Sequence, residues 1–456
     1  MRRLIYLLMR VFSALDHYAR ERLTGAGWLV LATAGAAAIA GIDTNQTVTY
    51  RAFTFLAALL AIAFGARLLW RARVRFEREL PRYATAGEPF SYRVTVHNQG
   101  AKPLAGATLK EHFGDPRPAY ALWQRTREPG EERRNWYDRN MGYFRWRWLI
   151  ERRLPEDAPE VALPALAPGA SETVKLAMTP RRRGRIELAG LTLARTEPLG
   201  LARSLARATL PGRVIALPKR YRLPRLALPG KRRYQPGGVS LASAIGDSEE
   251  FVALRDYRPG DPLQRIHWKS FARAGKPMVR EFQDEFFERH ALVLDTGRAQ
   301  GEDDAFEDAV AIAASFVYTI DTQECLLDLL FVGGDARPDR APRVRDYTAG
   351  RGQLQSTQML EVLAGVAPSA PGDFELLARA VLAQRAQLTS CILLFVDWSA
   401  SRRRLVEALV GAGLEVRALL VCGEDEKPAA APPWLLVLHP GTIEAGLALL
   451  DAVRQG

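Results

Sequence analysis

The sequence predicts a membrane-anchored chain of several domains: a transmembrane α-hairpin, a β-sandwich-like middle domain and a C-terminal, doubly wound α/β domain. Two apolar segments near the N-terminus predict the hairpin, and short alternating strands separated by turns predict the middle domain. A regular alternation of apolar strands with helices predicts the last domain. We place these parts at residues 1–75, 76–217 and 241–456, with a basic linker at 218–240.

The hairpin prediction depends on length and charge. Residues 24–42 contain no charged residue, and residues 52–70 contain only Arg67, near their end. About 20 apolar residues are needed to span a bilayer, so each segment just suffices. Arginines flank both segments on the outer sides, and this placement predicts cytoplasmic N- and C-termini at a bacterial inner membrane crossed more than once. Before the first span, residues 4–15 predict an amphipathic helix at the membrane interface.

The middle domain is predicted from strands at residues 91–97, 172–178, 184–188 and 190–195. Between them, Phe144, Trp146 and Trp148 alternate with Arg145 and Arg147, which predicts a half-buried strand with one basic face. Such a face could stack on single-stranded nucleic acid, contact anionic lipid headgroups or simply be solvated. No nucleic-acid recognition motif accompanies it, so we expect the lipid bilayer as a partner and no nucleic acid.

Charge is divided unevenly along the chain. Residues 1–240 contain 41 Lys and Arg against 19 Asp and Glu, whereas residues 241–456 contain 22 against 32. A basic half of this kind indicates a polyanionic surface nearby, and two apolar spans favour the membrane.

In the α/β domain we expect strands at residues 289–295, 325–332, 391–397, 415–422 and 434–439. The expected helices are at 303–320, 374–388, 401–412 and 443–453. Two strands end in an acid, Asp295 and Asp397. Doubly wound sheets place ligands at the carboxyl ends of their strands, so these two acids are the candidates for a site there.

The densest local pattern is the signature segment, residues 250–273. Pro259 and Gly260 predict a turn, Asp261 an N-cap, and residues 262–273 a helix that ends at Gly275. We expect the ring of Trp268 to be buried and the segment's charges to form either an ion-paired brace or a docking surface. Its candidate residues are Glu250, Phe251, Arg255, Tyr257, Gly260, Asp261, Arg265, Trp268, Lys269 and Arg273.

These residues resemble the bacterial family catalogued as domain of unknown function fifty-eight. The pattern Glu-Phe, Leu-Arg-x-Tyr, Gly-Asp, Arg-x-Ile-x-Trp-Lys and Ala-Arg is met across residues 250–273, and the layout adds Arg182-Arg-Gly184 and Pro198-Leu-Gly-Leu201. The resemblance implies a degenerate von Willebrand factor A-like domain. It also implies partnership with a MoxR-type AAA+ ATPase, often with a transglutaminase-like membrane protein, and brings no established activity.

Metal and cofactor chemistry has little support. The metal site of von Willebrand domains needs Asp-x-Ser-x-Ser, but this chain has Asp295-Thr-Gly-Arg-Ala299. With Asp295 and Asp397 as weak candidates only, we expect no cofactor and no Mg²⁺ binding tighter than about millimolar. Its cysteines, Cys325, Cys391 and Cys422, lie far apart without zinc or redox spacing.

The sequence therefore favours a membrane-anchored interaction or assembly protein of the bacterial envelope, with no catalytic residue and no enzymatic activity. It has no GxSxG, HExxH or GxxxxGK[ST] motif. The alternative is a hydrolase or metal-dependent enzyme that uses the strand-end acids.

Overall fold

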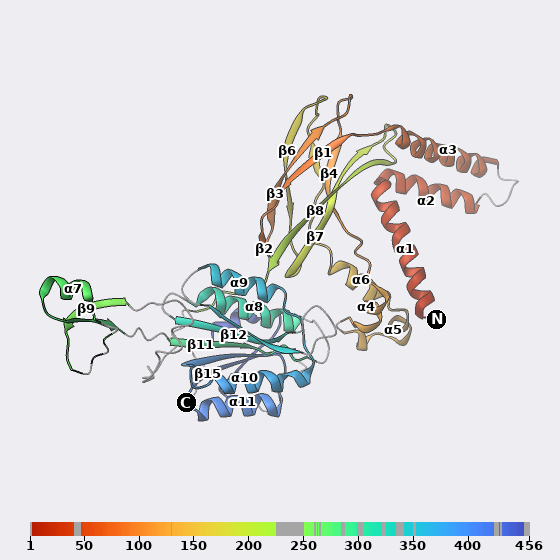
Figure 1. Cartoon of the computed structure of the whole chain (residues 1–456). Coiled ribbons are helices and arrows are strands. Elements are labelled where there is room, and N and C mark those ends of the chain that lie inside the picture. The colour runs from red at the N-terminus through yellow and green to blue at the C-terminus, as the bar shows by residue number, and fades with distance from the viewer. Residues whose placement is uncertain are drawn as a thin grey trace. The chain divides into compact units, whose positions relative to one another are not determined.

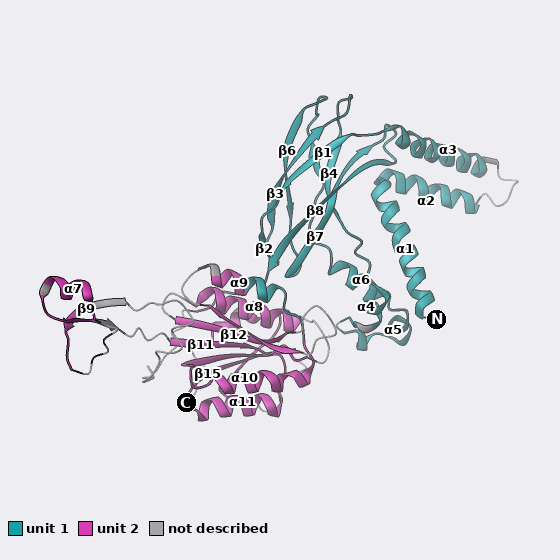
Figure 2. Ribbon diagram, viewed as in Figure 1, with its two compact units in different colours: residues 1–221, 300–303, 360–367 teal, residues 222–299, 304–359, 368–456 magenta. Residues whose placement is uncertain are grey.

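A computed structural model describes residues 2–40, 47–128, 130–224, 250–259, 261, 263, 266–283, 288–298, 304–320, 325–333, 342–349, 353–423, 428 and 431–450. Most of the predicted linker at 218–240 lies outside these residues. The chain divides into two compact units (Figure 2), the first made of residues 1–221, 300–303 and 360–367 and the second of residues 222–299, 304–359 and 368–456.

The first unit begins with the helices α1 (Arg2–Arg22), α2 (Gly25–Ala40) and α3 (Thr47–Leu69) (Figure 1). Within α3, Val48–Leu69 is 22 residues long and almost wholly unburied, and in the described part of the chain it is the one helix long and apolar enough to cross a membrane. Helix α2 is apolar but has 16 residues, or about 24 Å, which is short of a bilayer core of about 30 Å. Two helices of spanning length were expected. In the described residues the structure has one, α3, and the other apolar helix, α2, is shorter.

Two sheets follow in the first unit. One has the order β1-β3-β6 and the other β2-β8-β7-β4-β5. Alternate residues of both sheets, among them Val94, Leu109 and Leu193, are buried in a shared apolar core. The strands are β1 (Val74–Glu79), β2 (Tyr83–Thr85), β3 (Phe90–Asn98), β4 (Ala107–Phe113), β5 (Val161–Leu163), β6 (Ser171–Met178), β7 (Gly184–Thr196) and β8 (Arg203–Leu217).

The aromatic and arginine-rich insertion between β4 and β5 is helical. It contains α4 (Tyr120–Arg125), α5 (Trp136–Met141) and α6 (Tyr143–Glu151), so the strand predicted around Phe144–Trp148 is wrong. Trp146 and Leu149, three residues apart, share the buried face of α6 and pack with Trp123 and with Tyr6 of α1. The alternation of aromatic residues with arginines suggested a strand. The same residues also fit a helix, because Trp146 and Leu149 are three positions apart and so lie on one helical face.

The main body of the second unit is a six-stranded sheet of order β13-β12-β11-β14-β15-β16, in which only the edge strand β13 is antiparallel. Its strands are β11 (Glu288–Leu294), β12 (Cys325–Gly333), β13 (Arg343–Ala349), β14 (Ser390–Phe395), β15 (Glu415–Val421) and β16 (Leu435–Leu438). The expected strands are present, and β13 is an addition. When these strands are numbered along the chain from β11 as strand 1, their order across the sheet is 3-2-1-4-5-6. This order puts a topological switch point between β11 and β14.

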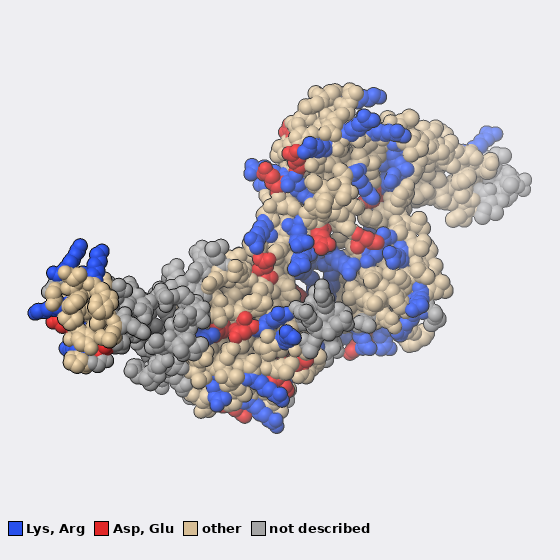
Figure 3. Space-filling model, in the orientation of Figure 1, with Lys and Arg blue, Asp and Glu red and all other residues tan. Residues whose placement is uncertain are grey.

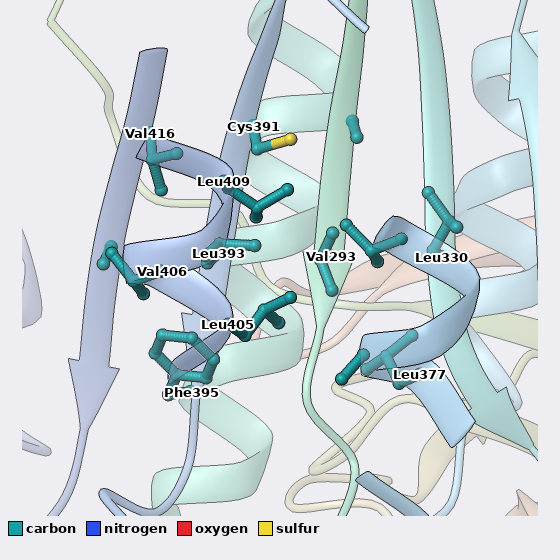
Figure 4. Packing of buried hydrophobic residues seen from close by; sticks show 14 of the residues in the cluster. Val293, Leu330, Leu377, Cys391, Leu393, Phe395, Leu405, Val406, Leu409 and Val416 are labelled. Carbon is teal, nitrogen blue, oxygen red and sulfur yellow. The ribbon is translucent and has the colours of Figure 1, made fainter. Parts of the chain in front are cut away.

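Helices cover both faces of this sheet (Figure 1). They are α8 (Asp304–Thr319), α9 (Gln353–Ala364), α10 (Phe374–Gln384), α11 (Ala400–Gly411) and α12 (Ile443–Leu447). On one face, Leu377 of α10 and Leu405 and Leu409 of α11 pack onto Val293, Leu393 and other strand residues (Figure 4). This tight packing holds the strand ends, and hence the acids that follow them, in fixed positions.

Candidate functional site

The signature segment folds as a small substructure of the second unit, which we call the signature unit: β9 (Glu250–Asp256), α7 (Trp268–Ala274) and β10 (Met278–Gln283). Strands β9 and β10 pair antiparallel, with Arg255 opposite Val279. The helix begins at Trp268 rather than at residue 262 as predicted, because Ile266 forms a β-bridge with Val279 and cannot be helical. Gly275, in the left-handed conformation, ends α7 as predicted.

Asp261 braces the base of the signature unit. Its carboxylate accepts two hydrogen bonds from the Arg255 guanidinium, Nη1 to Oδ2 and Nη2 to Oδ1, both at 2.7 Å, and a third from the Arg258 amide at 2.9 Å. The Arg255 hydrogen bonds lower the pKa of Asp261 to about 2, so the pair stays ionised at neutral pH. Asp261 was predicted to cap the helix, but the later start of α7 leaves it to tie β9 to the turn.

Trp268 lies on the surface of the signature unit. Its side chain is 63% exposed. The ring of Phe271 packs edge-to-face against it, with the ring centres 6.1 Å apart, and is 38% exposed. Leu263 is 65% exposed. The prediction of a buried Trp268 is wrong because Ile266 and Val279 fill the interior instead. Trp268 and Phe271 form what we call the aromatic patch.

The structure places some of the other signature residues. Lys269 and Arg273 are exposed on α7, and the amide of Tyr257 bonds to the Pro277 carbonyl beside the β9–β10 pairing. Gly260 and Arg265 lie outside the described residues, as do the side chains of Glu250 and Phe251. His267 fixes the start of α7, since its ring Nδ1 is 2.6 Å from Ser270 Oγ and its amide bonds to the Met278 carbonyl.

The comparison of sequences decides the family of this region. Residues 253–398 match the family described as "Protein of unknown function DUF58". The resemblance read from the signature segment is thereby confirmed over the DUF58 region, which takes in most of the signature unit and the sheet as far as the end of β14.

A relative of this chain is the "Uncharacterized protein YeaD" of Bacillus subtilis (strain 168), which is 33% identical over 90 residues. The match covers 19% of this chain and 22% of YeaD, so the chain spans about a fifth of that relative's length.

Among solved structures, a GH20 exo β-N-acetylglucosaminidase from Vibrio harveyi in complex with N-acetylglucosamine aligns with a TM-score of 0.17 at 8% identity, covering 81% of this chain and 78% of that one. A β-glucosidase from Paenibacillus barengoltzii aligns with a TM-score of 0.12 at 11% identity, covering 84% and 42%. At such scores neither alignment carries an argument about this chain.

Within the DUF58 region, Asp295 and Asp397 follow β11 and β14 and therefore meet at the switch point of the sheet. Arg402, in the first turn of α11, lies between them. Its Nε donates to Asp295 Oδ2 at 3.0 Å, and its Nη1 is 3.3 Å from Asp397 Oδ2. Arg402 and Asp295 are 3% and 1% exposed, so the guanidinium occupies the interior of the site.

Three further groups contact the Arg402 guanidinium. Its Nη1 donates to Ser399 Oγ at 3.0 Å, its Nη2 to the Gly297 carbonyl at 3.3 Å, and its guanidinium lies 4.4 Å from the centre of the Phe374 ring. Gly297 stands where a metal-binding serine is expected, and a side chain there would meet Asp295 Oδ1 at 3.2 Å and Arg402 Nη2 at 3.4 Å. The arrangement leaves Asp295 bound to an arginine and to the Gly297 amide, at 2.9 Å.

Burial raises the pKa of Asp295, and the Arg402 charge and hydrogen bond act against that rise. Among the described residues no group of three or more His, Cys, Asp or Glu side chains could hold a metal ion. Sequence reasoning missed Arg402 because its two acidic partners come from different segments, and Asp295 is more than a hundred residues away in the chain. The signal that could have found it is an arginine five residues after a strand-end acid, at the start of a helix.

The cysteine at the centre of the sheet has no reactive character. Cys391 is buried in β14, and burial raises the pKa of its thiol to about 12. A thiol with so high a pKa is protonated at neutral pH and is a poor nucleophile.

A second ordered hydrogen-bond network joins the start of α2 to the loop at residues 198–201, which contains the expected Pro-Leu-Gly-Leu pattern. Buried Glu197 organises this loop by accepting hydrogen bonds from the amides of Leu199, Leu201 and Ala202. The loop in turn accepts from Thr24, whose hydroxyl is 2.6 Å from the Gly200 carbonyl and whose amide is 3.0 Å from the Leu201 carbonyl. The start of α2 is therefore fastened to the sandwich.

Proposed function

We propose that this chain is a membrane-anchored interaction protein of the bacterial inner membrane that docks a MoxR-type AAA+ ATPase through its signature unit, with no catalytic activity of its own. The observation that carries the proposal is the exposure of Trp268 within the DUF58 region. Large aromatic side chains that stand on a surface beside cations are characteristic of binding hot spots.

The anchoring part of the proposal is supported by α3, which is long and apolar enough to span, and by the apolar helix α2 packed beside it. The face of these two helices that Figure 3 shows is almost entirely free of charged side chains. Helix α1 adds an exposed apolar row at helical spacing, which suits a position at the membrane interface. Its members are Leu4, Leu8, Val11, Phe12 and Leu15. The arginines at residues 2–22 and 67–75 favour cytoplasmic ends.

The non-enzymatic part is supported by Arg402. The strand order 3-2-1-4-5-6, with Asp295 and Asp397 after the carboxyl ends of β11 and β14, suits a von Willebrand factor A-like body. Such a body would bind a partner through a shared cation, but here a guanidinium lies between the acids. Partner binding then has to come from side-chain complementarity, and the aromatic patch offers it.

The patch is also suited to electrostatic steering. Lys269 and Arg273 are exposed on the same short helix as Trp268, and charges at the rim of an interface mainly set the association rate and its salt dependence. Trp268 and Phe271 would supply the affinity, and Arg255 with Asp261 would hold their platform rigid.

The proposal is tested by affinity purification of the full chain in mild detergent with mass spectrometry. We expect the ATPase to be recovered with the wild-type chain and recovered in smaller amount with Lys269→Glu/Arg273→Glu. The matched control is Arg379→Glu/Arg404→Glu, which reverses two exposed charges on α10 and α11 of the same unit. Failure to recover a MoxR-type ATPase with any of these chains, or equal recovery with all, contradicts the proposal.

A further inference from the structure

A cavity of about 380 Å³ lies within the first unit, at the end of the sandwich where β7 begins. Three segments line it: residues 113–116 after β4, residues 152–155 after α6, and residues 180–187 in the β6–β7 turn and the start of β7. Its size falls within the range of about 300–1,000 Å³ that is typical of small-molecule sites. The expected Arg182-Arg-Gly184 pattern, which the proposed function does not use, forms part of this lining.

The lining is strongly basic. It contains six arginines, Arg152, Arg153, Arg181, Arg182, Arg183 and Arg185, against two carboxylates, Asp115 and Glu187. Asp115 is itself engaged by Arg117, which lies outside the lining and donates to Asp115 Oδ1 at 2.5 Å. Burial acts to raise the pKa of Asp115, but these hydrogen bonds lower it overall, so the group is ionised and paired. The cavity therefore presents a net positive field.

The backbone and neighbouring groups hold several of these arginines in position. Gly184 has a φ of 120°, a conformation that side chains rarely adopt, and it closes the turn that carries Arg181–Arg183. Arg152 lies 4.2 Å from the centre of the Trp148 ring. Arg153 donates to the Arg117 carbonyl at 3.3 Å. Carbonyls and aromatic rings orient a guanidinium without removing its charge.

From this cavity we infer a binding site for a phosphate-bearing small molecule or headgroup. Several guanidinium groups around one hollow match the oxygens of a phosphate, each able to donate two parallel hydrogen bonds. A single carboxylate would leave most of the lining charge unbalanced, whereas a phosphate or pyrophosphate group brings two or more charges to one place. The site is separate from the signature unit, and its existence does not depend on ATPase docking.

The phosphate could belong to a water-soluble molecule or to a lipid headgroup, and the experiment separates these sources. Binding of inorganic pyrophosphate and of short-chain phosphatidic acid to the full chain in detergent is measured by calorimetry. The test variant is Arg181→Gln/Arg185→Gln, in which two exposed lining arginines lose their charge. The matched control is Arg93→Gln/Arg195→Gln, which removes two exposed charges from the same sandwich outside the cavity.

We expect binding to the wild-type chain and to the control, and binding weakened about tenfold or more in the test variant, with unchanged melting temperatures. Cavity-dependent binding of pyrophosphate assigns a soluble ligand, and cavity-dependent binding of phosphatidic acid alone assigns a headgroup. The inference is overturned if neither probe binds the wild-type chain, or if test and control variants lose affinity equally, since that would mean general charge attraction.

Discussion

The Cα of Gly27 in α2 lies so close to the Leu201 carbonyl that a Cβ on Gly27 would stand 2.0 Å from that oxygen. The contact seats the first turn of α2 against the loop that Glu197 organises. It joins the first turn of α2 to the loop that follows β7, so the packing of this helix against the sandwich depends on a residue without a side chain.

Gly27→Ala is expected to destabilise this junction, because the added methyl group meets backbone rather than a movable side chain. Overpacking of this kind costs about 1–3 kcal/mol. Gly25→Ala is the matched control, since a Cβ there meets nothing within 4 Å. Thermal unfolding of the full chain in detergent checks both variants, and equal melting temperatures would mean that the close approach has no energetic consequence.

Arg402→Met is expected to lower stability by about 3–5 kcal/mol, since it leaves Asp295 buried without its cation. The loss should grow as pH rises. Removing Arg402 raises the folded-state pKa of Asp295 further, so the folded state holds a proton that the unfolded state, with a pKa near about 3.9, releases. Stability then falls as pH rises from about 4 to the raised folded-state pKa of Asp295, and is constant above it.

The measurement is the difference in unfolding free energy between wild-type chain and Arg402→Met at pH 5 and pH 8. The double variant Arg402→Met/Asp295→Asn should lose this pH dependence because the titrating group is gone. A difference that is constant with pH would show that Asp295 is not the group that Arg402 stabilises.

Trp268→Ala is expected to cost less than about 1 kcal/mol, because the indole is mostly solvent-exposed. Ile266→Ala, two residues earlier and buried against Val279, should cost about 2–5 kcal/mol. Denaturant unfolding monitored by hydrogen exchange of the β9–β10 amides compares the two. A larger cost for Trp268→Ala would show that its ring is buried, and the aromatic patch would then not exist.

Reporter fusions test the proposed topology. A fusion after Asp43, between the two apolar segments, should report the periplasm, and one after Gly456 the cytoplasm, because the arginines lie outside both segments. A cytoplasmic signal at Asp43 would mean that α2 does not cross the membrane, and a periplasmic C-terminus would reverse the orientation.

The α/β body was largely predictable because its central strands are continuous apolar runs and its helices are amphipathic. The strand ends at Asp295 and Asp397 followed directly. Strand β13 was not predicted, since this edge strand is mostly polar and only its last residue, Ala349, is buried. Helix α6 was mistaken for a strand because its buried face is completed by Tyr6, more than a hundred residues away.

The candidate sites were harder to predict than the fold. Ile266 and Trp268 are equally apolar in sequence, and only the β-bridge to Val279 decides which of them is buried. The role of Arg402 required knowledge that α11 starts beside both acids. The arginine cavity draws on three separated segments, of which the sequence indicated only the Arg182-Arg-Gly184 pattern.

The most direct test of the central claim is the dissociation constant between the full chain in detergent and the purified MoxR-type ATPase of the same organism. Loss of two hot-spot aromatics should weaken binding by about thirtyfold or more, so we expect this change for Trp268→Ala/Phe271→Ala. Tyr318→Ala, which removes an exposed aromatic from α8, should bind as the wild-type chain does. An unchanged dissociation constant for Trp268→Ala/Phe271→Ala in a folded chain would contradict docking through the signature unit.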